Sequence, residues 1–488
     1  MNTSAVVTIL TAILGIVVSF MLLPICVALF YRETHEAVVF AVVMGSTLLL
    51  LTSLYVWGRR RIAMLRRHDL MPRDGFLAVT LSWFLVSMVG AMPFWLTGSI
   101  PSFTHAFFET MSGFSTTGAT ILTDIESLPR SILFWRSLTQ WLGGMGIVVL
   151  TVAIIPLLGI GGMQLLEAEA PGPTVDKLVP RIGQTAKLLW MLYLGFTVTE
   201  ISLLMVGGLD LYDAVTHTFS TISTGGFSTK NASISFYRSA YVEWVVILFM
   251  VIGGTNFTLF YLFLQRRFRE ILRSSEFRIY LVLIILGTLF TTVTLWGNGT
   301  YKDAGTAVRS GLFQVVSILT TTGFSSDDFT RWPFFAQTIL FFLMFVGGCA
   351  GSTGGGIKVI RLVALLKLAF NEVKYLLHPR GVFTLTIGGC PVRKEFIYSV
   401  TGFFSLYVFF VLVTTLVVAS ANFDLATSLT TALATVGNIG PGLALVGPTS
   451  NYAQFPAYVL WWISFAMMAG RLEIYTVLVL FTREFWRR

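Results

Sequence analysis

The sequence predicts an all-α, polytopic membrane protein built from four repeats with pseudo-fourfold symmetry. Each repeat is a span, a short half-helix and a second span, and two N-terminal transmembrane helices precede the repeats. Of 488 residues, 55% are hydrophobic and only 12% are charged, as is typical of membrane proteins. Many apolar runs approach the ~20 residues that a helix needs to cross a bilayer. Four similar segments recur along the chain, which indicates internal repetition.

The first two apolar runs, 5–30 and 38–57, are the expected N-terminal helices. They must be helical because lipid cannot satisfy the open backbone of an isolated strand. Basic residues cluster after them at 59–73 and again at 266–278 and 358–380. The positive-inside rule assigns such loops to the cytoplasm. Two spans before the first basic loop then put the N-terminus in the cytoplasm, and the basic C-terminal end is expected there too.

Four segments aligned on one glycine define the repeats. They read HAFFETMSGFSTTG (105–118), YDAVTHTFSTISTG (212–225), SGLFQVVSILTTTG (310–323) and DLATSLTTALATVG (424–437). Each is too short to cross a bilayer and lies between two full apolar runs. The expected division of the chain is 1–73 for the N-terminal helices with their basic loop, then pore repeats at 74–160, 161–268, 269–380 and 381–488.

The turn after each short segment has the composition of an ion filter. A half-helix that enters from outside directs its carbonyl end, which carries about half a negative charge, toward the bilayer centre. The following turn can replace the hydration shell of an alkali cation with backbone carbonyls. Glycine permits the positive φ that this geometry requires. Irregular backbone at membrane depth is tolerated where it is buried or lines a water-filled path. We therefore expect four loops around a central ion pore.

These features resemble the Trk/Ktr/HKT superfamily of cation transporters. The two extra N-terminal helices, EAPGP at 169–173 and GGCAGSTGGGIKVIR at 347–361 are similar to its bacterial TrkH branch, and the resemblance covers essentially the whole chain. It implies potassium uptake across the bacterial inner membrane by a homodimer with one pore in each protomer. It also implies control by a cytoplasmic nucleotide-binding ring of the TrkA type. The chain itself has no Walker A or GxGxxG nucleotide motif, so no cofactor is expected beyond K⁺ as the transported ion.

The resemblance also implies which residues form the filter. They are Thr116, Thr117 and Gly118; Ser223, Thr224 and Gly225; Thr321, Thr322 and Gly323; and Thr435, Val436 and Gly437. In the superfamily a serine at the first of the four glycine positions accompanies sodium transport, so four glycines imply the potassium-selective type. The residues that follow are Ala119, Gly226, Phe324 and Asn438, which predicts only approximate fourfold symmetry.

The third repeat carries six glycines within 347–356. Glycine costs ~1 kcal/mol in a helix interior, so this stretch is not expected to be continuous helix. A kink or close helix packing is one explanation. Its place after a filter segment favours an intramembrane loop that obstructs the cytoplasmic half of the pore, and the resemblance implies a gate. The candidate gate residues are Gly351, Ser352, Thr353, Gly354, Gly355, Gly356, Lys358 and Arg471.

Three polar residues in apolar surroundings need separate interpretations. Arg471 lies near the middle of the last apolar run, where a charge is expensive. One interpretation is an ion pair with Glu473 or another carboxylate that joins two helices. The interpretation that we prefer places the charge of Arg471 in the pore below the filter. Glu109, nine residues before Gly118, is expected to brace the filter from behind rather than to bind the ion. His217 is expected to be a satisfied polar residue in the same layer.

Cysteine and histidine give little sign of a metal or disulfide framework. The five histidines form no i, i+4 pair, and no transition-metal site is expected. Cys26, Cys349 and Cys390 are an odd, widely spaced set near apolar segments. We expect them to be buried thiols.

Ion permeation is the predicted function, driven inward by a membrane potential worth about 2.3 kcal/mol per charge per 100 mV. Coupled K⁺/H⁺ or K⁺/Na⁺ symport is the alternative, although the sequence has no intramembrane acidic pair that favours it. An enzyme would need a nucleophile with a base, or a metal cluster. The repeated hydroxyl residues have no recurring histidine partner, so the chain is not expected to be an enzyme. A receptor or scaffold would need no repeated filter.

Overall fold

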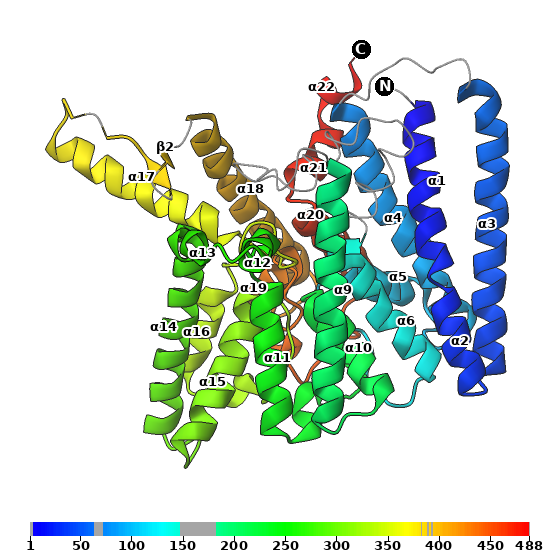
Figure 1. Cartoon of the computed structure of the whole chain (residues 1–488), viewed down its shortest axis with the longest axis horizontal. Helices are drawn as coiled ribbons and strands as arrows, with labels where there is room; N and C mark the ends of the chain where they lie inside the picture. Colours follow the sequence, from blue (N-terminus) through cyan, green and yellow to red (C-terminus); the bar gives the residue numbers. More distant parts are fainter. Residues whose placement is uncertain are drawn as a thin grey trace.

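The computed structural model describes residues 3–62, 72–146, 182–381, 383–387, 390–391 and 394–487. The EAPGP motif, the predicted boundary after residue 160 and most of the first basic loop lie outside these ranges. The regular secondary structure of the described residues is almost entirely helical (Figure 1). Its only strands are a two-residue antiparallel pair, β1 (Thr386–Ile387) and β2 (Cys390–Pro391). The predicted helical membrane fold is confirmed.

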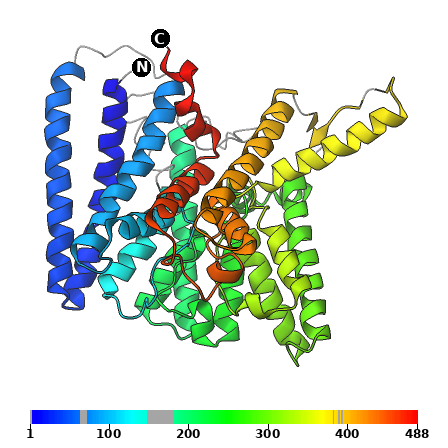
Figure 2. The same ribbon diagram turned by 180° about the vertical axis from the view of Figure 1, so that it is seen from behind.

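The N-terminal helices form a layer at one side of the molecule (Figures 1 and 2). Helices α1 and α2 together provide one apolar span, and α3 provides a second. Helix α1 packs against both α3 and α4. The bounds are α1 (Thr3–Ser19), α2 (Leu22–Phe30), α3 (Thr34–Ile62) and α4 (Pro72–Leu96). The two chain ends lie at the same end of the molecule.

Four short helices occupy the positions predicted for the half-helices. They are α5 (Phe103–Phe114), α10 (Leu211–Ile222), α15 (Ala304–Leu319) and α19 (Leu425–Val436). Each packs against the long helix that precedes it, namely α4, α9 (Ile182–Val206), α14 (Ser275–Gly297) or α18 (Lys394–Ala419). Three of the short helices have an aspartate as N-cap residue, whose side chain accepts a hydrogen bond from a backbone N–H of the first turn. These residues are Asp210, Asp303 and Asp424. Such caps satisfy donors that helix formation leaves open.

The helices that follow the short helices are all interrupted. Helix α6 (Arg130–Trp141) continues as the π-helix η1 (Leu142–Gly146). Helices α11 (Ala240–Gly253) and α12 (Phe257–Leu264) meet at 98°, and α20 (Ala457–Arg471) meets the segment Tyr475–Phe481 at 113°. A long loop separates α16 (Phe334–Leu343) from α17 (Val359–Leu377). By length and composition, six described helices could cross a membrane, or eight if each bent pair is one span.

Short elements complete the described chain. They are η2 (Ser233–Tyr237), α13 (Phe268–Arg273), η3 (Phe329–Arg331), η4 (Ala444–Val446), α21 (Tyr475–Leu478), η5 (Val479–Phe481) and α22 (Arg483–Trp486).

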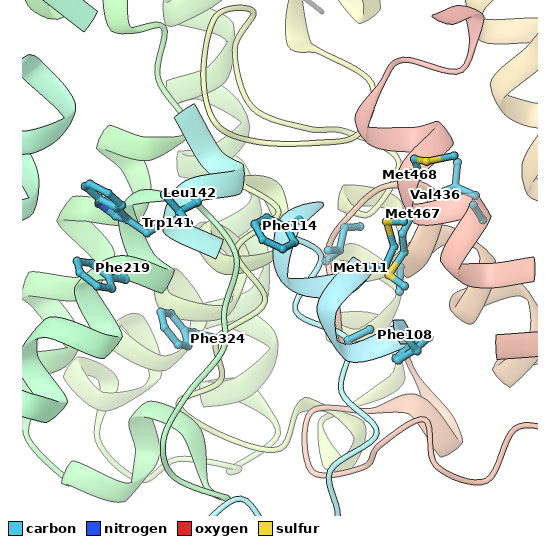
Figure 3. Close-up of a cluster of buried hydrophobic side chains, with 14 of the residues drawn as sticks. Phe108, Met111, Phe114, Trp141, Leu142, Phe219, Phe324, Val436, Met467 and Met468 are labelled. Carbon is cyan, nitrogen blue, oxygen red and sulfur yellow. The ribbon is translucent and has the colours of Figure 1, made fainter. Parts of the chain in front are cut away.

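Large apolar side chains pack the short helices into the centre of the molecule. Figure 3 shows Met111 of α5 and Met467 of α20 in one buried cluster with Trp141 and Phe219. The rings of Trp141 and Phe219 lie 5.2 Å apart. This packing holds the ends of the short helices rigidly, as a site built from loops requires. The prediction of buried thiols is confirmed for Cys349 and wrong for Cys26, which lies exposed on α2. The exposure of Cys390 lies outside the described side chains.

Candidate ion pathway

The loop after each short helix has the same backbone conformation. In every loop, two residues two positions apart have positive φ. The pairs are Thr116 and Gly118 (52° and 82°), Thr224 and Gly226 (54° and 75°), Thr321 and Gly323 (59° and 81°), and Asn438 and Gly440 (54° and 96°). A positive φ is uncommon outside glycine and clusters at functional sites. The repetition defines equivalent positions in the four loops.

The four loops meet backbone to backbone in a closed ring. A Cβ atom on any of the four glycines would come closer than 3.0 Å to a carbonyl oxygen of the next loop. The pairs are Gly118 with Gly225, Gly226 with Thr322, Gly323 with Ile439, and Gly440 with Thr117. Each carbonyl belongs to the residue just before the next glycine, so the contacts run once around an axis and return to the start. We call residues 116–118, 224–226, 321–323 and 438–440 the filter ring.

The predicted register matches this ring in the first and third loops but not in the second. Gly226, not Gly225, has the positive φ and approaches the next loop. Ser223 is the C-cap residue of α10. Gly225 is glycine for a different reason, because a Cβ there would overlap the amide of Gln140. Two consecutive glycines made the sequence ambiguous, and alignment on the first of them was wrong by one residue.

In the fourth loop the predicted register was wrong by three residues. Thr435 and Val436 belong to the last turn of α19, and Gly437 caps the helix with an ordinary φ of −79°. The ring position falls to Gly440, which is followed by Pro441. The Val-Gly pair at the helix end imitates the Thr-Gly pairs of the other loops, whereas the Gly-Pro-Gly turn beyond it was the signal that could have corrected the alignment.

A buried ion pair braces the first two loops. Glu109 of α5 and Arg136 of α6 are joined at 2.6 Å between Oε1 and Nε, and both are nearly inaccessible. The carboxylate also accepts the hydroxyl of Thr120 at 2.8 Å and the N–H of Ile121 at 2.9 Å. Arg136 donates from Nη1 to the carbonyl of Ser228 at 2.9 Å. The pair therefore links the chain after the first ring segment to the chain after the second, which is the bracing arrangement predicted for Glu109.

Amide and hydroxyl side chains connect the loops further. Gln140 donates to the carbonyl of Gly225 at 2.6 Å and accepts the N–H of Phe227 at 3.0 Å. Asn438 donates to the hydroxyl of Thr117 at 2.9 Å and so joins the fourth loop to the first. His217 has a partner on each ring nitrogen, the carbonyl of Asp213 and the hydroxyl of Ser228, as predicted for a satisfied polar residue.

A cavity of about 130 Å³ opens over one side of the ring. All four ring glycines line it, together with residues that follow them in the chain, among them Thr120, Ser228, Lys230 and Tyr452. Tyr452 donates its hydroxyl to the carbonyl of Gly440 at 2.7 Å. The cavity forms a polar vestibule on the side of the ring away from the ends of the short helices.

The glycine-rich loop (residues 347–358) lies against the opposite side. It is not helical, and a parallel bridge between Val346 and Ile357 closes its neck. At its tip, the hydroxyl of Thr353 donates to the last carbonyl of α10, that of Ile222, at 3.0 Å. The N–H of Gly355 donates to the hydroxyl of Thr321 at 2.7 Å. A Cβ on Gly355 would overlap the carbonyl of Gly437. The loop therefore abuts the second, third and fourth units.

Internal contacts shape the rest of this loop. Gly351 and Gly356 have positive φ values of 70° and 63°. The hydroxyl of Ser352 donates to the carbonyl of Cys349 at 2.6 Å. Lys358 donates from Nζ to the carbonyl of Gly354. The predicted gate residues of this loop thus lie together in one compact turn.

Arg471 joins the glycine-rich loop to the first unit. It ends α20, and its guanidinium donates to the carbonyl of Thr353 at 2.7 Å and to those of Gly143 and Gly144 at 3.0 and 2.9 Å. Glu473 forms an ion pair with Arg361 of α17. Arg471 thus adds the first repeat to those that the loop already contacts, so that all four repeats hold the loop. These backbone carbonyl partners could not be inferred from the sequence.

The arrangement is a backbone-lined ring between a polar vestibule and an obstructing loop. The ends of four short helices meet at the ring, and their carbonyl ends favour a cation there. Among the described residues, no group of three or more histidine, cysteine, aspartate or glutamate side chains could hold a metal ion. The geometry therefore suits a permeating cation held by backbone oxygens.

Comparisons with known proteins agree with this geometry. The family model TrkH, described as cation transport protein, matches residues 47–487. The Trk system potassium uptake protein TrkH of Escherichia coli is 40% identical over 490 residues, with 98% of this chain and 99% of the relative covered. The TrkH of Halomonas elongata is 44% identical, with 86% and 88% covered.

A solved structure is similar throughout. The crystal structure of the potassium transporter TrkH from Vibrio parahaemolyticus matches with a TM-score of 0.88 and 37% sequence identity. The match covers 100% of both chains. The likeness thus extends along the whole chain rather than over one part of the fold.

Proposed function

The chain belongs to the TrkH family of cation transport proteins, and on that premise we propose that it takes up potassium through the filter ring, driven by the membrane potential and gated by the glycine-rich loop. Family membership makes it a multi-pass membrane transporter and not an enzyme. The names of its relatives, potassium uptake proteins, support potassium as the ion.

The observation that carries the proposal is the closed sequence of glycine-to-carbonyl approaches around the ring. Backbones this close leave no room for side chains at the four glycines, so carbonyl oxygens supply the ligands. Such oxygens replace the hydration shell of an alkali cation without a fixed charge. The carbonyl ends of four short helices add a negative potential at the same place. The ring residues thus replace Gly225 and Gly437 of the sequence-based assignment by Gly226 and Gly440.

The gating proposal rests on the position of the glycine-rich loop. Its tip hydrogen-bonds to the end of α10 and to Thr321 of the ring, and Arg471 ties it to Gly143 and Gly144. A potassium ion that leaves the ring on this side meets the loop and a guanidinium. Conduction therefore requires the loop tip to withdraw.

The cellular setting is also part of the proposal. We assign the chain to the bacterial inner membrane as a homodimer, with a cytoplasmic nucleotide-binding ring of the TrkA type as its regulator. Both chain ends lie at one end of the molecule (Figure 1), and the basic loops favour the cytoplasm for that end. Nucleotide would act only through the partner.

Flux into liposomes that contain the purified chain tests the proposal. Rubidium and sodium uptake are measured while the imposed potential and the pH gradient are varied separately. Permeation predicts rubidium entry in proportion to the potential, slower sodium entry and no effect of the pH gradient. Coupled symport, the alternative, predicts rubidium entry driven by a proton or sodium gradient at zero potential. If neither ion enters even after deletion of residues 347–358, the filter proposal is wrong.

A further inference from the structure

Glu276 holds both ends of the glycine-rich loop with one carboxylate oxygen. It lies in the first turn of α14 and is 9% exposed. Its Oε1 accepts the N–H of Ala350 at 2.7 Å and the N–H of Ile360 at 3.1 Å. Ala350 is near the start of the loop, and Ile360 is just past its end, in the first turn of α17. The carboxylate therefore ties the start of the loop to the segment just past its end. We call this part of the loop its base.

We propose that Glu276 is the positioning residue that keeps the glycine-rich loop closed beneath the ring. The inference rests on the proposed function and adds the group that controls its gate. A glycine-rich chain loses more conformational freedom on ordering than other chains, so a closed loop with six glycines needs strong anchors. Hydrogen bonds to a carboxylate are roughly twice as strong as those between neutral groups. Glu276 provides two of them.

The carboxylate of Glu276 lies near two helix N-termini. Its side chain lies at the N-terminus of its own helix, where Ser274 caps the first turn, and at the N-terminus of α17, where Ile360 donates. Helix N-termini stabilise anions through their unpaired N–H groups and the helix dipole. The N-terminus of α17 donates one N–H to Oε1, and α14 carries the carboxylate in its own first turn. The site is therefore organised around the carboxylate and is not an accident of one surface rotamer.

Bonds between neutral backbone groups also hold the loop base. The N–H of Gly347 donates to the carbonyl of Ile357 at 2.9 Å. The N–H of Cys349 donates to the carbonyl of Gly254, at the break between α11 and α12, at 2.8 Å. These bonds hold the neck in register and attach it to the second unit. Loss of Glu276 would leave them to restrain the loop and would leave the partly buried N–H of Ala350 and the buried N–H of Ile360 without their acceptor.

The accessibility of the Cys349 thiol reports directly whether the loop base is closed or open. It is 0% exposed and one residue from Ala350. When the base is fastened, a water-soluble thiol reagent cannot reach this sulfur. When the base opens, the thiol becomes accessible, independently of whether ions pass the ring.

The test uses the full chain with Cys26 and Cys390 replaced by serine, reconstituted in liposomes without a regulatory partner. Glu276→Ala removes both hydrogen bonds, and Glu276→Gln keeps an acceptor oxygen but removes the charge. Glu270→Ala is the matched control, because Glu270 is an exposed acid on α13 that pairs with Arg267. Two quantities are measured: the rate of Cys349 modification by a charged maleimide, and rubidium influx at a fixed imposed potential.

We expect Glu276→Ala to raise both the labelling rate and the rubidium influx about tenfold, because two charge-assisted hydrogen bonds are lost. Glu276→Gln should give a smaller increase in each, and Glu270→Ala should match the parent. The glutamine variant keeps the test valid if the alanine variant fails to fold, which size-exclusion chromatography would reveal.

Two results would overturn the proposal. One is a folded Glu276 variant whose Cys349 reacts at the parent rate. The other is faster labelling with unchanged rubidium influx, because the base would then open without opening the path. Both leave the proposed function intact as long as the parent chain carries rubidium. Failure of the proposed function looks different: no variant, including a deletion of residues 347–358, would carry rubidium at all.

Discussion

Arg471 donates a hydrogen bond to the carbonyl of Thr353 at 2.7 Å, and so the last helix of the fourth unit holds the tip of a loop that belongs to the third. The same guanidinium reaches Gly143 and Gly144 of the first unit. Three units thus meet at one side chain directly beneath the ring.

Replacement of Arg471 by alanine is expected to raise basal rubidium influx about a hundredfold, because three hydrogen bonds of about 1 kcal/mol each are lost. Arg471→Lys keeps a positive charge but not the planar fork that serves three carbonyls, so it should lie between alanine and the parent. Arg483→Ala, in α22, is the control. Equal influx in the alanine variant and the parent would show that Arg471 does not hold the loop closed.

The second-loop register can be tested by rescue. The atoms nearest to a Cβ on Gly225 belong to the Gln140 side chain, whereas a Cβ on Gly226 meets the backbone carbonyl of Thr322 and is strained by a φ of 75°. Gly225→Ala should therefore lose rubidium influx and partly recover it when Gln140→Ala is added. Gly226→Ala should stay inactive in the same background, because the backbone carbonyl of Thr322 cannot move aside as a side chain can. Recovery of both variants would contradict the assigned register.

The fourth-loop register predicts an order of severity. A Cβ on either glycine would come close to a backbone carbonyl, that of Leu433 for Gly437 and that of Thr117 in the first loop for Gly440. Gly437 has an ordinary φ of −79°, whereas Gly440 has a φ of 96° that a side chain would strain. Gly440→Ala should abolish the preference for rubidium over sodium, while Gly437→Ala should retain part of it. Uptake of both ions by the two variants, compared at the same protein content, checks the order. A more damaging Gly437→Ala would restore the register predicted from sequence.

The Glu109 and Arg136 pair is expected to be a strong stability determinant. Removal of either partner, as in Glu109→Leu or Arg136→Met, leaves a buried charge alone and should cost about 3 to 5 kcal/mol of unfolding free energy. The double variant Glu109→Leu with Arg136→Met should cost much less than the sum, because neither charge is then stranded. Thermal unfolding of the purified proteins in detergent measures all three. Additive losses would show that the two side chains act independently.

Tyr452 is expected to tune the ring without supporting the fold. Tyr452→Phe removes the hydrogen bond to the carbonyl of Gly440 and leaves the ring packing in place. The freed carbonyl should reduce the rubidium-to-sodium influx ratio several-fold, in line with a bond of about 1 kcal/mol. The melting temperature should change little. An unchanged influx ratio would exclude a role for this hydroxyl in ion discrimination.

Much of the fold could be predicted because bilayer length and repetition act locally along the chain. The short helices were too short to span, and their hydroxyl-rich ends identified the loops. The sequence alignment and the ring coincide at Gly118 and Gly323, because each is the single glycine after a threonine run. Gly226 and Gly440 were missed because neighbouring glycines compete for the same alignment, and only the φ angles and the ring contacts distinguish them.

Contacts between segments that are distant along the chain could not be predicted from the sequence. The cost of a membrane charge identified Arg471, but its carbonyl partners lie 118 to 328 residues away. Glu276 was missed altogether, because an acidic residue in a first helical turn amid arginines looks like an ordinary surface residue. Its role appears only when Ala350 and Ile360 are brought to the same oxygen.

The filter ring is made by a single chain, and this changes how selection can act on it. In an assembly of four identical subunits, one substitution alters four equivalent positions at once. Here a substitution at Asn438 or Thr224 changes one quarter and leaves three untouched. Ion preference can thus drift in small steps, each tolerable, and the four quarters are free to specialise. The Thr, Thr, Thr and Asn that open the four ring segments are the outcome that such independent histories would leave.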